Sequence, residues 1–314
     1  MIGESWELAD LADDKSLVSD GPLAGMTIRA PLDEHGPALG FTTAQCVRPF
    51  GLLIKFLDAN DVLSVQVHPD ENVCRLFPDA QLKTECWYVL DAESGSVIYR
   101  GLIPGVNREK LLEALKEQCV EDFMAVYPAR NGDFHYLPAG TIHALGAGVV
   151  VAEIQTPSNT TYRLYDWNRR DNQGHGRPLH IEQALASVHY TDKPESTELN
   201  PPTGPGVIGP KQPQVSGLQS LAEQFGTAKH LLDCPHFSVV HVMYSPGDRE
   251  IQLDRPIVMI CLEGTGTLVN QNLPEHPCTY QKGDTILWPA LSAGIIKSPQ
   301  SGTYLLTCLG PEKA

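Results

Sequence analysis

Two short apolar segments carry polar side chains at a spacing that suits chemistry. Side chains alternate along a strand, so in DVLSVQVHPD, residues 61–70, Gln66 and His68 share one face. In the next segment, KTECWYV, Lys83 and Glu85 likewise share a face. Because buried polar groups need partners, convergence of such side chains on a metal ion is one economical explanation. The alternative is that the histidines are satisfied within a polar interior.

A repeated motif supplies another histidine. Residues 132–143 follow the pattern G-x5-P-x-G-x2-H, which ends at His143. Residues 283–294 repeat the frame, with Leu291 replacing the second glycine and Gly294 replacing the histidine. The pattern resembles the second cupin motif, in which the turn leads into a strand and the histidine points into a barrel. The resemblance implies two barrels, of which the first keeps a metal ligand and the second has lost it.

The candidate metal ligands are an amide, two imidazoles and a carboxylate: Gln66, His68, Glu85 and His143. Such a set suits Zn²⁺ and leaves a coordination position for water or substrate. Fe²⁺ and Mn²⁺ also accept these ligands, so the spacing alone leaves the metal open. We predict one metal ion per chain, held in the first part of the sequence.

Short strands are expected to position these residues. Apolar runs rich in β-branched residues predict strands at residues 62–68, 84–90, 149–155, 237–244, 257–263 and 303–309. Many short strands between Gly/Pro turns are typical of a sandwich or barrel. Helical spacing of apolar residues predicts two helices, at residues 107–119 and 179–188. The expected fold class is all-β, with two cupin (double-stranded β-helix, or jelly-roll) domains and a few short helices.

A Pro/Gly-rich stretch divides the sequence. Residues 191–220 contain six prolines and four glycines, which cannot build the interior of a sheet. We expect a metal-binding catalytic cupin domain at residues 1–190 and a linker at 191–228. A degenerate C-terminal cupin domain without a metal site is expected at 229–314.

Composition excludes several classes of partner. The 314 residues include 23 Lys and Arg against 38 Asp and Glu, a net charge of −15. This charge argues against nucleic acid and anionic membranes, although a small anionic substrate needs only a few local cations. No secretory signal or apolar membrane span is evident, and the eight cysteines lack a CxxC pair. We expect a cytoplasmic protein with reduced thiols; the oligomeric state stays open, with a monomer favoured.

A long ordered series of motifs resembles one family. GESWEL, LLIKFLDANDVLSVQVHPDE, KTECWYVLDA, PAGTIHALGAG and EIQTPSNTTYRLYDWNR follow one another within residues 3–169. Together they resemble type I mannose-6-phosphate isomerases in their short bacterial form, across nearly all of residues 1–190. The resemblance implies a zinc-dependent aldose–ketose isomerase that interconverts mannose 6-phosphate and fructose 6-phosphate through an enediol.

The resemblance also implies roles for individual residues. Gln66, His68, Glu85 and His143 match the zinc ligands. Arg163 would stabilise developing negative charge. Lys83 would contact substrate or carry a proton, for which burial would have to lower its pKa. Glu153 is a second acid–base candidate, and the choice of base stays open. Arg169 is the candidate phosphate contact.

One departure from the family pattern concerns ring opening. The family commonly has Asp where this chain has Asn159, and an amide cannot take up a proton in the same way. A sugar-phosphate-binding protein without turnover, or an isomerase with a shifted substrate, is therefore the alternative. A cupin oxygenase is disfavoured, because Gln66 takes the first histidine's place and Glu85 follows His68 by 17 residues.

Overall fold

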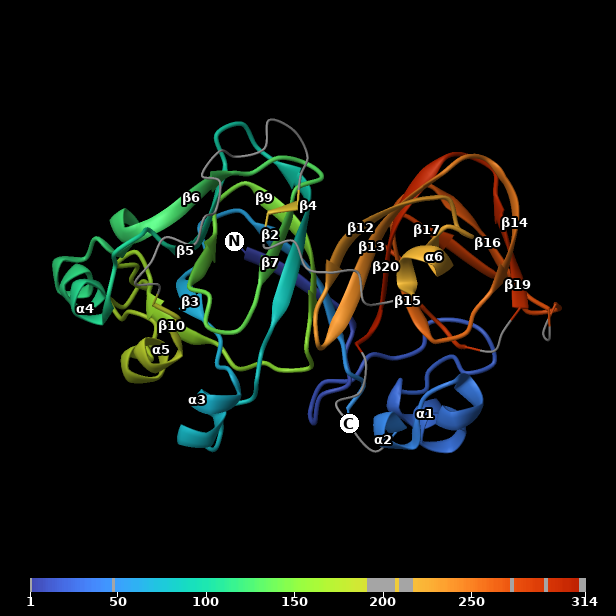
Figure 1. Cartoon of the computed structure of the whole chain (residues 1–314), viewed down its shortest axis with the longest axis horizontal. Helices are drawn as coiled ribbons and strands as arrows, with labels where there is room; N and C mark the ends of the chain where they lie inside the picture. Colours follow the sequence, from blue (N-terminus) through green and yellow to red (C-terminus); the bar gives the residue numbers. More distant parts are fainter. Residues whose placement is uncertain are drawn as a thin grey trace. The chain divides into compact units, whose positions relative to one another are not determined.

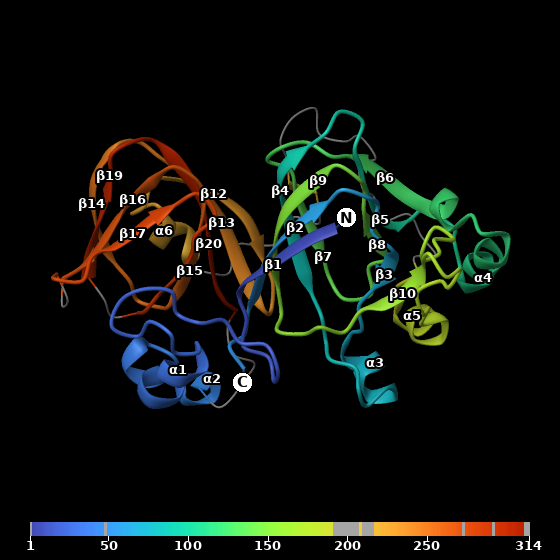
Figure 2. The same cartoon turned by 180° about the vertical axis from the view of Figure 1, so that it is seen from behind.

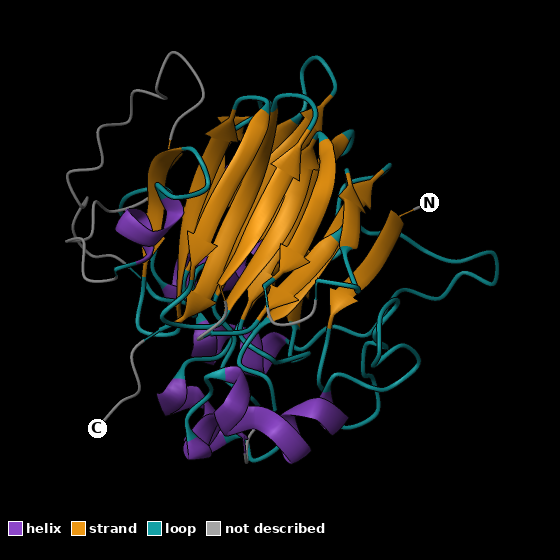
Figure 3. Cartoon of the chain, turned by 90° about the vertical axis from the view of Figure 1, so that its right-hand side faces the viewer, coloured by secondary structure: helices purple, strands orange, loops and turns teal. Residues whose placement is uncertain are grey.

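The computed structural model describes residues 2–46, 49–190, 207–208, 217–271, 274–290 and 293–310. Strands form most of its regular structure, and the helices are few and short (Figure 3). The expectation of an all-β chain with a few short helices is confirmed. Most of the expected linker lies outside the described residues, as does Leu291 of the second motif.

The chain divides into two compact units whose boundaries differ from those expected. Of the described residues, 2–5, 55–190 and 207–208 form the first unit, and the others form the second. Residues 6–54 thus group with the C-terminal half, although the sequence suggested one domain over residues 1–190. The strands that flank this excursion, β1 (Ile2–Leu8) and β2 (Leu53–Ala59), are neighbours in a single sheet.

Two sheets build the first unit, and they are seen from the front in Figure 1 and from behind in Figure 2. Their strand orders are β1-β2-β9-β4-β7-β11 and β10-β3-β8-β5-β6. The remaining strands are β3 (Val65–Val67), β4 (Glu85–Ala92), β5 (Val97–Leu102), β6 (Met124–Pro128), β7 (Phe134–Leu137), β8 (His143–Leu145), β9 (Val149–Gln155), β10 (Tyr162–Tyr165) and β11 (Val207–Ile208). Apart from β1–β2 and β5–β6, neighbouring strands are not consecutive in the sequence, as is typical of a jelly roll.

The alternation predicted for the strand before His68 is confirmed. Val65 and Val67 are fully buried in an apolar cluster with Leu111 and Leu185. These leucines come from α4 (Arg108–Glu117) and α5 (Ile181–Ser187), which are the two predicted helices, each slightly shorter than expected. As predicted, Asn107 caps α4, because its side chain accepts a hydrogen bond from the Lys110 amide. Gln66, between the valines, points away from this cluster.

The repeated motif forms the same turn in both units. Gly132 and Gly283 adopt left-handed backbone conformations, with φ of 86° and 94°. Each donates its N–H over 2.9 Å to a carbonyl of an adjacent strand, Val89 in the first unit and Cys261 in the second. The sequence repeat therefore reflects a structural repeat.

The second unit has sheets of order β12-β13-β20-β15-β18 and β14-β19-β16-β17. The strands are β12 (Thr227–Asp233), β13 (Phe237–Tyr244), β14 (Gly247–Gln252), β15 (Ile257–Glu263), β16 (Thr265–Asn270), β17 (Cys278–Gln281), β18 (Thr285–Trp288), β19 (Ala293–Ser298) and β20 (Gly302–Leu309). Its core contains a hydroxyl network in which Tyr280 contacts both Tyr304 and Ser298, while the Tyr304 ring stacks on Tyr244. Aromatic rings and hydroxyls thus fill the centre of this unit.

Short helices complete the chain. The second unit includes α1 (Arg29–His35), the 3-10 helix η1 (Gly36–Leu39), α2 (Thr43–Cys46) and α6 (Leu218–Ala222); the first includes α3 (Glu71–Leu76) and the 3-10 helix η2 (Val120–Phe123). Leu218, Leu221 and Phe225 pack into the core of the second unit, so its structure begins before residue 229, within the expected linker. None of the helices described is long and apolar enough to cross a membrane.

Candidate metal centre

A row of facing residues crosses one sheet of the first unit. Arg163 on β10 lies opposite Gln66 on β3, and Gln66 lies opposite His143 on β8. Directly opposed residues of antiparallel strands point to the same face, so these three side chains share one wall of the barrel. His68 follows β3 on the same face, and Glu85 enters from β4 of the other sheet. The fold thereby gathers all four candidate ligands.

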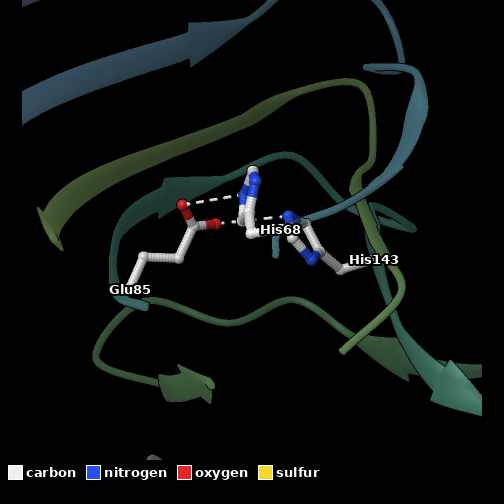
Figure 4. Close-up of side chains that lie close together, drawn as sticks. All are labelled: His68, Glu85 and His143. Carbon is white, nitrogen blue, oxygen red and sulfur yellow. Dashed lines mark ion pairs between the residues drawn. The ribbon is translucent and has the colours of Figure 1, made fainter. Parts of the chain in front are cut away.

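Glu85 stands at the centre of this group (Figure 4). Its Oε2 lies 3.2 Å from Nε2 of His68, and its Oε1 lies 3.2 Å from Nε2 of His143. The three side chains are 0–2% exposed. Gln66 joins them, because its Nε2 lies 3.3 Å from Nε2 of His143.

Backbone carbonyls fix the orientation of both imidazoles. Nδ1 of His68 lies 3.1 Å from the Thr160 carbonyl, and Nδ1 of His143 lies 2.8 Å from the Thr141 carbonyl. A carbonyl oxygen only accepts, so each Nδ1 carries the proton. Each Nε2 therefore presents a lone pair to Glu85. Holding a histidine through its second ring nitrogen is the usual arrangement at metal sites.

Electrostatics favour the neutral imidazole and the charged carboxylate. Burial, reinforced by the Lys83 charge, lowers the pKa of His68 to about 3. Burial alone would raise the pKa of Glu85, but the adjacent Lys83 and His68 outweigh it and hold that pKa well below its ordinary value. The cluster therefore places the lone pairs of neutral imidazoles beside the buried negative charge of Glu85.

These residues fit a divalent cation. Nε2 of His68 and both carboxylate oxygens of Glu85 are buried without a hydrogen bond of acceptable geometry. The candidate ligand atoms of His68, Glu85 and His143 lie within 4.8 Å of one another. Unsatisfied acceptors in a dry interior are costly, and a cation that binds all of them removes that cost. Two imidazoles and a carboxylate are the donor set that zinc accepts in open sites.

Lys83 and Glu153 extend the cluster along the second sheet. Nζ of Lys83 lies 2.9 Å from Glu85 Oε2. Burial would lower the pKa of Lys83, but Glu85 and Glu153 together raise it, opposite to the direction that a lysine base requires. Burial and the Glu85 charge raise the pKa of Glu153 to about 7. Trp87, opposite Glu153 across β4 and β9, donates its indole N–H to Glu153.

Arg163 lies at the edge of the same wall. It is half-buried, its Nε donates to Ser64 Oγ at 3.3 Å, and Nη1 donates to the Pro178 carbonyl at 2.9 Å. Burial and the nearby Arg177 lower its pKa from the ordinary value. Both acceptors are neutral, so neither of these contacts neutralises the positive charge of the guanidinium.

Arg169 and Asn159 lie apart from the ligand cluster. Arg169 pairs with Asp61 at 3.2 Å and with Asp166, so its charge is already matched. Asp166 also binds Arg177. Asn159 is exposed in the loop between β9 and β10. The structure therefore does not bring these two residues into direct contact with the four ligands.

Sequence reasoning missed three residues of this neighbourhood. Lys55 is buried in β2 near Glu153, Ser64 orients Arg163, and Arg177 adds a cation beside Asp166. The sequence contains a signal for Lys55 and for Ser64. Lys55 is the single charge within the apolar run LLIKFL, and Ser64 shares the face of Gln66 at a spacing of two.

The jelly-roll units and the buried imidazole–carboxylate cluster define a cupin with a candidate metal centre. Comparison with known proteins narrows this class. The model of the family "Phosphomannose isomerase type I, catalytic domain" matches residues 1–86. The mannose-6-phosphate isomerase of Streptococcus mutans serotype c is 32% identical over 288 residues, covering 91% of this chain and 82% of that protein. The chain belongs to the type I mannose-6-phosphate isomerases, a family of enzymes.

Solved structures agree. The mannose 6-phosphate isomerase from Bacillus subtilis matches with a TM-score of 0.76 and 28% identity, covering 98% of this chain and 89% of that one. A zinc-bound mannose 6-phosphate isomerase matches with a TM-score of 0.66 at 16% identity, covering 98% and 91%. At that identity the second likeness concerns the fold alone. The expected two-cupin architecture is confirmed.

Proposed function

We propose that this chain interconverts mannose 6-phosphate and fructose 6-phosphate with one bound Zn²⁺, through an enediol. The observation that carries the proposal is the convergence of His68, Glu85 and His143, in which Nε2 of His68 and both Glu85 oxygens are buried without a hydrogen bond. Gln66 is the fourth proposed ligand, through its amide oxygen. Zinc held there supplies a Lewis acid that polarises the sugar carbonyl.

Glu153 is the proposed base. Isomerisation needs a group that takes the proton from C2 of the aldose and returns it to C1. A carboxyl with a pKa of about 7 can both accept and release a proton near neutral pH, and such a group typically contributes roughly 10²–10⁴-fold. Lys83 carries a positive charge beside Glu85 and is proposed to bind a substrate oxygen rather than remove the proton.

Arginines are proposed to stabilise the negative charges of the enediolate and the phosphate. Arg163 lies on the ligand wall and is directed by Ser64, which suits it to stabilise an enediolate. Arg169 is the proposed phosphate contact, for which the phosphate would have to compete with Asp61 and Asp166. Asn159, in the adjoining loop, remains a proposed substrate contact.

The decisive test is a coupled assay of fructose 6-phosphate formation by the purified protein. Treatment with a chelator should abolish turnover, and stoichiometric Zn²⁺ should restore it. A Glu85→Gln variant, which removes the central charge, should neither retain zinc nor recover activity. A zinc-loaded protein that binds mannose 6-phosphate without turnover would contradict the proposal and favour a binding role.

A further inference from the structure

The loops that carry His68 and His143 are tied together by a residue outside the metal centre. The Gly140 amide, three residues before His143, donates to the His68 carbonyl at 2.9 Å. The His189 amide in turn donates to the Gly140 carbonyl at 2.9 Å. His189 thus extends a backbone link between the two ligand-bearing loops.

The His189 ring forms a second link. Its Nε2 lies 3.2 Å from Oδ2 of Asp70, two residues after His68. The other oxygen of Asp70 accepts from the amides of Asn72 and Val73 and so caps α3. One carboxylate therefore anchors both the helix that follows the His68 loop and the His189 ring.

Gly140 shows how closely the ring approaches the second loop. Its backbone is left-handed, with φ of 86°, and a Cβ placed there would lie 2.4 Å from Cγ of His189. The ring thus covers the Gly140 Cα, where another residue would both clash and be strained. The second glycine of the motif has a packing reason as well as a conformational one.

Helix α5 holds His189 in place. Ala184, Leu185 and Val188 are buried in the apolar cluster that also contains Val67 and Ile142. These last two residues lie directly before His68 and His143 in the sequence. The position of His189 is therefore fixed relative to both ligand strands.

We infer that His189 is a positioning residue for the metal centre, which closes a ring of contacts through Gly140, His68 and Asp70. The inference rests on the proposed zinc site. The His189 and Asp70 side chains are 60% and 22% exposed, so their pair contributes little to global stability. Outer contacts that orient ligand loops nevertheless typically change metal affinity by 10–100-fold. A metal-specific effect without global destabilisation is the expected signature.

The test compares His189→Ala with two variants and one control. His189→Gln retains a side-chain donor for Asp70, and Asp70→Asn retains a helix cap while removing the charge. The matched control is His175→Ala, which removes another exposed histidine of the same unit paired with an aspartate, Asp171, at 3.8 Å. Zinc affinity is measured by competition with a chromophoric chelator. Hydrogen exchange at the Gly140 amide and the Tm are measured on the metal-free proteins.

His189→Ala should weaken zinc binding about tenfold and speed hydrogen exchange at the Gly140 amide. The Tm of the metal-free variant should equal that of metal-free His175→Ala. His189→Gln should recover most of the affinity, and Asp70→Asn should show an intermediate loss. Zinc affinity and Gly140 exchange equal to those of the control would overturn the inference. If the wild-type protein binds no zinc, the proposed function fails, and Gly140 exchange alone decides whether His189 ties the loops.

Discussion

The indole Nε1 of Trp87 donates a 2.9 Å hydrogen bond to Oε1 of Glu153 inside the first unit. Both side chains are buried, and their residues face each other across β4 and β9. A neutral donor satisfies one oxygen of the carboxyl group but supplies no charge. Burial and Glu85 therefore decide the protonation of Glu153.

This arrangement predicts a pH-dependent stability difference between wild type and Glu153→Gln. The folded pKa of about 7 exceeds the ordinary 4.5, so the stabilising contribution of protonated Glu153 is fully present below pH 4.5 and is lost as pH rises through 7. The amide stays neutral and still accepts from Trp87. The unfolding free energy of the metal-free variant, relative to wild type, should rise by up to ~3 kcal/mol over that window.

Urea titrations of both metal-free proteins between pH 4.5 and 8 measure this difference. A constant difference across the range would show that Glu153 is ionised throughout. In the zinc-loaded enzyme the same variant should lose roughly 10²-fold or more in kcat, because the amide cannot accept the proton.

Removal of His143 should abolish metal binding. His143→Ala deletes one of three convergent ligand atoms and leaves Glu85 facing a void. Zinc content after dialysis, measured by atomic absorption, should fall to background, and turnover should fall with it. Retained stoichiometric zinc with normal turnover would remove His143 from the ligand set; His175→Ala is again the control.

Arg163→Ala should impair turnover without impairing metal binding. Arg163 donates its side-chain hydrogen bonds to Ser64 and Pro178 rather than to the metal ligands, so zinc content should stay normal. Loss of a cation that stabilises an enediolate should lower kcat by roughly 10²–10³. Arg75→Ala, which removes an exposed arginine of α3, should leave kcat unchanged. Equal kcat in both variants would refute the role of Arg163.

Asn159→Asp tests the departure from the family pattern. The side chain is exposed, so a carboxylate can be accommodated there without a large desolvation cost. If a carboxylate assists ring opening, kcat for mannose 6-phosphate should equal or exceed the wild-type value. Steady-state assays on freshly dissolved and equilibrated sugar phosphate measure this, and a large fall would show that the Asn159 amide has a role of its own.

Local sequence patterns predicted the features that depend on strand alternation and on turn geometry. The faces of Gln66 and His68, the cap at Asn107 and the turn at Gly132 follow from spacing and backbone preference alone. Lys55 stands out as the single charge in an apolar run, but the sequence does not show that it lies near Glu153. The pKa of Lys83 is raised by Glu85 and also by Glu153, which lies 70 residues away in sequence, so a local window could not give its direction.

The bounds of the compact units differ from the expected domain bounds for another reason. Residues 6–54 group with elements that follow residue 217, and such long-range association leaves no trace in a local window. Phe225 falls within the expected linker at residues 191–228, yet its side chain is fully buried.

The path of residues 6–54 has a consequence for how the protein is made. The chain leaves the first unit after Ser5, joins the second, and returns at Lys55. During synthesis, the segment that emerges almost first must wait for the last strand, β20, before its own unit is complete. A cut in the Pro/Gly-rich stretch would therefore leave nearly all of the first unit on one fragment but divide the second unit between two fragments. The second barrel is expected to depend on synthesis as one uninterrupted chain.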